Sequence, residues 1–192
     1  PVHSDTAYEG GDWISAKLTD GILNTNGSGT EYCGFHSNHP QERNRDARVW
    51  VDLGEVKAVD TVVLYPAGLA TDTVNATMPN AYAVEVSEDG ENWDRVYEVY
   101  DVETVPAGPV IIQFAEVDAQ FVKFVGLSLN NVNNAGFYCM KLSEMAVYNT
   151  DYVPANEPTP KNILANRPFE TSENAAHNDD VGKWGAGNLI NG

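Results

Sequence analysis

The chain has 192 residues, 42% of them hydrophobic, which is enough to bury the core of one ordinary globular domain with some length left over. Its 28 acidic side chains against 11 Lys and Arg give a net charge of -17, which repels nucleic-acid phosphates and anionic membrane surfaces. No apolar run approaches the length of a membrane span. From the charge and this observation together, we expect neither nucleic acid nor a membrane among its partners and favour neutral ligands or cations.

The first part of the chain is rich in small polar residues and shows little periodicity. We expect a short strand over residues 2–7, followed by loops in which Trp13 begins a helical turn that Gly21 ends. A second short strand is expected over residues 32–37. The polar stretch 38–45 that follows is expected to lie at the surface.

Apolar and polar side chains alternate from Arg48 to Leu53, which is typical of a half-buried antiparallel strand, and Gly54 ends the run. Residues 58–65 form the next expected strand, which Pro66 ends.

The dipeptide Asp89-Gly90 predicts a hairpin with a type I′ turn, because Gly readily adopts the positive φ that such a turn needs. Its flanks, residues 82–87 and 93–99, both alternate as strands do.

Two more strands are expected over residues 110–114 and 120–125, then an asparagine-rich loop over 130–134 and a last strand over 137–148. Short strands joined by turn-forming residues, with almost no helical period, predict an all-β fold. We expect an antiparallel β-sandwich or jelly roll over residues 1–149.

Residues 150–161 contain three prolines and predict an extended linker. Beyond it, Trp184–Gly192 matches Trp13–Gly21 without a gap at Trp, Leu and Gly, so residues 162–192 are expected to be the truncated start of a second repeat. Cys33 and Cys139 are either bridged or two buried thiols, and the sequence leaves both open.

Six pieces, in this order, carry a resemblance to a known family: residues 18–21, 50–54, 62–65, 84–93, 121–125 and 142–148. The ordered set resembles the discoidin domains, also called coagulation factor V and VIII type C domains. Within that family the chain is most similar to the bacterial family-32 carbohydrate-binding modules. The resemblance implies a jelly-roll β-sandwich of the galactose-binding-domain type, whose ligand specificity resides in its loops.

The resemblance also implies a structural Ca²⁺ that ties the first loop to the last strand. Its ligands would be the Asp20 side chain, the carbonyls of Lys17 and Ile22, the Ser143 carbonyl and the Glu144 carboxylate. A hard cation needs several oxygen ligands, and a carboxylate beside turning carbonyls supplies them. On the sequence alone, without the family, Asp20 is more often a turn-forming Asp.

Sugar recognition needs a flat apolar face for the C–H surface of the ring and a few polar groups for its hydroxyls. Family relatives place these groups in loops at one rim of the sandwich. By loop position the candidates are His36, His39, Arg43, Arg45, Asn131, Asn134, Phe137, Tyr138 and Trp13.

The alternatives are purely structural roles: Trp13, Trp50 and Trp93 would belong to the core, and the arginines would neutralise nearby acidic side chains. Ala67 stands where several sugar-binding relatives have a basic residue, which argues against a galactose-type site.

We find no catalytic motif in the sequence: no nucleophile elbow, no phosphate-binding loop and no zinc-ligand pair. Together with this absence, the resemblance implies a non-catalytic carbohydrate-binding module, extracellular or on the cell surface of a bacterium. It would hold a multidomain glycan-degrading enzyme on its glycan, with neighbouring domains of the same chain as further partners. The alternative is a structural or cell-adhesion discoidin domain without a sugar site.

Overall fold

The computed structural model describes residues 1–9, 13–23, 34–38, 43–44, 46–67, 77–103, 105, 108–131 and 138–149. The predicted linker and second repeat, residues 150–192, therefore lie outside the described residues. So does Cys33, whereas Cys139 is a buried free cysteine. In the described part of the chain, no helix is long and apolar enough to cross a membrane.

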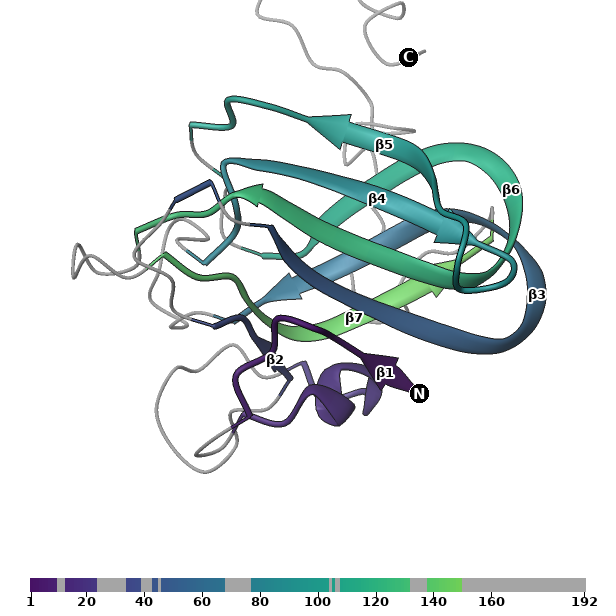
Figure 1. The fold of residues 1–192 in the computed structure, drawn as a ribbon, viewed down its shortest axis with the longest axis horizontal. Coiled ribbons are helices and arrows are strands. Elements are labelled where there is room, and N and C mark those ends of the chain that lie inside the picture. Colours follow the sequence, from purple (N-terminus) through teal and green to yellow (C-terminus); the bar gives the residue numbers. More distant parts are fainter. Residues whose placement is uncertain are drawn as a thin grey trace, which may run out of the picture. The chain divides into compact units, whose positions relative to one another are not determined.

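The described elements are almost all strands, joined by antiparallel pairing, which confirms the all-β prediction. In chain order they are β1 (Val2–His3), the 3₁₀ helix η1 (Ser15–Thr19), β2 (Phe35–His36), β3 (Ala47–Pro66), β4 (Ala81–Ser87), β5 (Asp94–Val99), β6 (Val110–Ser128) and β7 (Lys141–Tyr148). The pairing order is β2-β7-β3-β6-β4-β5, and β1 adds to β3 (Figure 1).

The strands β3 and β6 are each one long bent strand, where the sequence predicts two separate short ones. Figure 1 shows both curving round at the same end of the sandwich. The pairing register slips between Asp52 and Lys57, and Gly54 adopts a φ of +85° within that stretch. Gly54 therefore bends the strand and does not end it.

The bend places the two halves of each long strand in different layers. The first half of β3 pairs with β1 and with the second half of β6. That half of β6 also pairs with β4, and β4 pairs with β5. The second half of β3 pairs with the first half of β6 and with β7. One core contains side chains of both layers, among them Val49, Phe124, Leu64 and Leu142.

The hairpin between β4 and β5 forms as predicted, but the prediction of a type I′ turn is wrong. The strands end at Ser87 and resume at Asp94, so the connection is longer than a two-residue turn. Gly90 has a φ of +77°, whereas Asp89 does not have the positive φ that a type I′ turn needs at both positions. The Asp89 carboxylate instead accepts hydrogen bonds from the backbone N–H groups of Glu91 and Asn92, both at 2.8 Å.

Trp50 and Trp93 lie on the outer face of the sheet, so their interpretation as core residues is wrong. Both are half-buried, and their ring centroids are 6.2 Å apart. The Lys123 ammonium lies 3.3 Å from the Trp93 centroid and donates a hydrogen bond to Glu85 at 3.3 Å. The Trp50 and Trp93 rings thus cover the buried Lys123 ammonium, which forms an ion pair with the Glu85 carboxylate.

Candidate functional site

The loops at one end of the sandwich are tied to one another by backbone hydrogen bonds. The Leu129 N–H donates to the Arg43 carbonyl at 2.9 Å, and the Ser37 N–H donates to the Met140 carbonyl at 2.9 Å. The Lys141 N–H donates to the Thr77 carbonyl at 3.3 Å. We call this end of the sandwich the loop rim. It collects four segments that are far apart in the sequence.

An aromatic cluster on the β2 side of the rim brings together two predicted residues, His36 and Trp13. Their ring centroids are 5.0 Å apart in an edge-to-face arrangement, and the Tyr8 ring lies 5.4 Å from His36. His36 is only 2% exposed and its Nδ1 lies 2.5 Å from the Ser37 carbonyl oxygen, whereas Tyr8 is 41% exposed. His36 is therefore a buried support for the other two rings. No sequence signal singled out Tyr8.

The second feature of the rim is a polar pocket of about 510 Å³ around Arg43. The Arg43 guanidinium donates to the Asn80 side-chain oxygen at 3.2 Å, and the Asn80 amide donates to the Val102 carbonyl at 2.8 Å. Asp101 and Glu103 also line the pocket, and Asp101 has a φ of +56°, in the left-handed region. Arg43 was predicted, whereas Asn80, Asp101 and Glu103 were missed because only the fold brings them to it.

Two further predicted residues, Asn131 and Tyr138, form an isolated β-bridge across the asparagine-rich loop. Asn130, which directly precedes Asn131, donates a side-chain hydrogen bond to the Met78 carbonyl at 2.7 Å. His39, Arg45, Asn134 and Phe137 lie outside the described residues.

The two predicted carboxylate ligands of a cation, Asp20 and Glu144, lie near each other. Asp20 directly follows η1, and Glu144 is on β7. Glu144 is 7% exposed, and its Oε2 accepts a hydrogen bond from the Gly21 N–H at 3.2 Å. Burial raises the pKa of Glu144 to about 7, and the nearby Asp20 charge adds to the rise while the Gly21 N–H opposes it. Among the ion pairs of the described residues, none includes either carboxylate.

The predicted carbonyl ligands come from the same two segments. Lys17 and Ile22 flank Asp20, whose Oδ1 accepts a hydrogen bond from the Ile22 N–H at 2.9 Å. The Ser143 carbonyl faces Gly34 so closely that a Cβ on Gly34 would lie 2.7 Å from it. No group of three or more His, Cys, Asp or Glu side chains in the described ranges is arranged to hold a metal. A cation here would rely on carbonyl oxygens together with the two carboxylates, a donor set that fits Ca²⁺.

Several solved structures of other proteins are similar in fold to this sandwich. The module CpGH89CBM32-5 from Clostridium perfringens, solved in complex with GalNAc-β-1,3-galactose, is 18% identical with a TM-score of 0.56, over 77% of this chain and 94% of that one. The family-32 module of NanJ from C. perfringens, in complex with galactose, is 17% identical with a TM-score of 0.53, over 77% and 91%.

Chitosan-binding module 2 of a chitosanase/glucanase from Paenibacillus sp. IK-5, in complex with chitotriose, is 19% identical with a TM-score of 0.52, over 77% and 95%. No curated protein matches the chain. At these identities the three structures establish the jelly-roll sandwich fold. The model of the F5/8 type C domain family matches residues 3–140, which is most of the described sandwich, and the chain therefore belongs to that family.

Proposed function

We infer that this domain is a non-catalytic carbohydrate-binding module that binds a glycan at the loop rim. The observation that carries the proposal is the pairing of two features on one rim. Tyr8 and Trp13 offer ring surface over a buried His36, and Arg43 offers hydrogen-bond donors in a polar pocket. Three proteins of similar fold were solved with bound sugars, which supports a glycan as the ligand class.

Each part of the rim has a distinct job in this proposal. An aromatic face packs against the C–H surface of a sugar ring, and it does so without needing a charge on the ligand. The Arg43 guanidinium fixes the orientation of ring hydroxyls through its fork of N–H donors. Asn80 holds that guanidinium in place, since its own amide is anchored to the Val102 carbonyl at 2.8 Å.

The proposed setting is a secreted or surface-attached bacterial enzyme that degrades glycans, with this module beside further domains. A shallow site of this kind binds one sugar weakly. Linking two weak modules raises their effective concentration at a polymeric surface, so modest affinity at each suffices. The repeat of the motif around Trp13 near Trp184 supports such a tandem arrangement.

The test is a glycan array followed by calorimetry with the 192-residue chain. Arg43→Ala should weaken binding of the best glycan by about tenfold, because one charged hydrogen-bonding group is worth about 1.5–3 kcal/mol. The matched control is Arg95→Ala, which removes an arginine on β5 that pairs with Glu85 on β4. Absence of binding to any glycan by a folded chain would refute the proposal.

One observation favours the second candidate, a structural or adhesion domain without a sugar site. Ala67 lies in the rim and is buried, with its N–H donating to the Lys141 carbonyl at 3.0 Å. It thus contributes no polar side chain where several sugar-binding relatives have a basic one. A folded chain that docks neighbouring domains but ignores every glycan would favour this candidate.

A structural Ca²⁺ is also part of the proposal. The Asp20 and Glu144 carboxylates, with the carbonyls of Lys17, Ile22 and Ser143, are the residues that would hold it. Its role would be to neutralise two adjacent carboxylates, one of them buried, and so to fasten the first loop to β7. The supporting observations are that Glu144 is buried near Asp20 and that neither carboxylate takes part in an ion pair among the described residues; the raised pKa of Glu144 agrees with them.

A further inference from the structure

A row of three side chains crosses the aromatic side of the loop rim. The Tyr8 N–H donates to the His36 carbonyl at 2.7 Å, and His36 is the register partner of Lys141 between β2 and β7. Residues directly opposite each other in antiparallel pairs project to the same face of a sheet. Tyr8, His36 and Lys141 therefore lie side by side on one face, with the buried His36 in the middle.

The Trp13 ring connects His36 with the Lys141 side chain. Its centroid lies 5.0 Å from that of His36, and the Lys141 ammonium lies 5.5 Å from the Trp13 centroid. The ammonium is therefore part of the aromatic cluster. A cation–π contact at this distance is near its outer limit, so the ammonium can move to a stronger partner.

Lys141 takes part in none of the ion pairs among the described residues. Those ion pairs hold Arg48, Lys57, Arg95 and Lys123, each against an Asp or Glu side chain. Lys141 is half-buried, and the chain has 28 acidic side chains against 11 Lys and Arg. Its ammonium has thus lost part of its hydration beside the rings without gaining a carboxylate as counter-ion.

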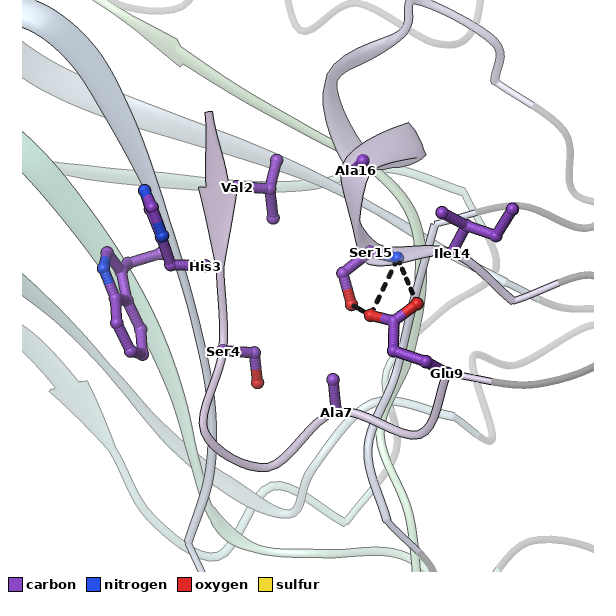
Figure 2. A pocket seen from close by; sticks show the side chains of 9 residues that line it. Val2, His3, Ser4, Ala7, Glu9, Ile14, Ser15 and Ala16 are labelled. Atoms are coloured by element: carbon purple, nitrogen blue, oxygen red, sulfur yellow. Dashed lines mark hydrogen bonds between the residues drawn. The ribbon is translucent and has the colours of Figure 1, made fainter.

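The neighbours of the row explain why no acid of this part of the rim pairs with Lys141. Glu9 directly follows Tyr8, but Figure 2 shows its carboxylate bonded to Ser15 at the start of η1, where it accepts from the N–H at 3.2 and 3.3 Å and from the hydroxyl. Ala67 donates its N–H to the Lys141 carbonyl at 3.0 Å, and it is buried and has no polar side chain.

We propose that Lys141 determines the specificity of the rim and selects glycans whose sugar rings carry a carboxylate, that is, uronic acids; this rests on the proposed function. The sugar ring packs against Tyr8 and Trp13, and its carboxylate forms an ion pair with the Lys141 ammonium. A charge-assisted hydrogen bond of this kind is stronger than the contact with the Trp13 ring that it replaces.

The dimensions and the electrostatics of the row fit such a ligand. Tyr8 and Lys141 are two strand spacings apart, roughly 10 Å, which a uronic acid with its carboxylate can span. The net charge of -17 repels an anion at long range. Salt screens that repulsion beyond about 10 Å at 0.1 M ionic strength, so the contact with Lys141 decides the preference.

The test uses backbone amide titrations of the ¹⁵N-labelled 192-residue chain with two pairs of sugars that differ only at C6. These pairs are galactose with galacturonic acid and glucose with glucuronic acid. At least one acid should bind about fivefold more tightly than its neutral counterpart, because a partly exposed ion pair contributes about this much. The same acid should shift the amides of Tyr8, His36 and Lys141.

Lys141→Met keeps the alkyl stem but removes the charge, so it should give the acid and the neutral sugar equal affinities. Lys141→Arg should restore the preference for the acid. Lys57→Met is the matched control, because it changes the net charge by the same amount at a lysine that pairs with Glu55 in the bend of β3. This variant should keep the full preference.

A preference for the acid that persists in Lys141→Met would overturn the inference, and so would a natural chain that binds the acid no more tightly than the neutral sugar. The second result needs no variant, so it decides even if Lys141→Met does not fold. Neutral sugars that bind the rim as tightly as the acids would leave the proposed function intact and remove only the role of Lys141. A folded chain that binds no glycan at all would refute both.

Discussion

Glu144→Gln removes a buried negative charge next to Asp20, and its effect on stability should reverse when Ca²⁺ is added. The pKa of Glu144 rises from 4.5 to about 7, mainly because the group is buried. Since one pKa unit corresponds to about 1.4 kcal/mol, the ionised carboxylate destabilises the cation-free fold by up to about 3 kcal/mol.

The sign follows from the direction of the shift. The folded state holds the Glu144 proton more tightly than the unfolded chain, so stability in the absence of a cation should fall as the pH rises from 4.5 to about 7. In chelator above neutral pH, the Gln variant should therefore be more stable than the natural chain. The gain will be smaller than the full value because the Gly21 N–H donates a stronger hydrogen bond to a carboxylate than to the amide oxygen of Gln.

Urea unfolding in chelator and in Ca²⁺, at an acidic and an alkaline pH, measures these differences. A cation that binds only the folded state stabilises it by RT ln(1 + [L]/Kd), so Ca²⁺ should stabilise the natural chain and leave Glu144→Gln nearly unchanged. Equal stabilisation of both chains by Ca²⁺ would refute the ligand role of Glu144. Equal stability of the two chains in chelator at alkaline pH would refute the argument from burial.

Four more substitutions test the structure elsewhere. Gly34→Ala should cost at least about 2 kcal/mol in urea unfolding, because its Cβ would lie 2.2 Å from a backbone oxygen, whereas Gly54→Ala, in open space, should cost about 1 kcal/mol. Lys123→Ala should cost about 1–2 kcal/mol and change Trp fluorescence, since its ammonium lies 3.3 Å from the Trp93 centroid; an unchanged spectrum would contradict the contact. Asp89→Ala should speed hydrogen exchange in the β4–β5 hairpin. Because backbone N–H donors, that of Asn92 foremost, hold the pKa of Asp89 well below its usual range, the natural hairpin should stay protected at a pH where ordinary Asp is protonated.

Local patterns in the sequence sufficed for the strands but not for the way they join. The alternation from Arg48 to Leu53 correctly places Trp50 on the face opposite the core side chains, because side-chain direction in a strand has a period of two. That Trp50 shares this outer face with Lys123 depends on pairing between β3 and β6, which the sequence does not display. The same holds for the continuity of β3 past Gly54: a glycine with positive φ serves a bend as well as a turn.

Which of the predicted site residues share a neighbourhood depends on tertiary contacts. Asp20 and Glu144 lie near each other although they are far apart in the chain, and a cation bound by them stays a prediction. Tyr8 and Asn80 carry no motif, and they enter the rim only because the fold packs their segments against His36 and Arg43. The sequence gives the side-chain chemistry of Tyr8 and Asn80, whereas their contacts follow only from the fold.

The continuity of β3 and β6 through both layers also bears on how the domain comes apart. Each layer contains one half of β3 and one half of β6, so both layers share the same two continuous strands. One layer therefore cannot melt while the other stays folded, and unfolding should be a single cooperative transition seen alike by every probe. A force that pulls on the two ends of this domain is therefore resisted by the whole sandwich, which should give way as one unit.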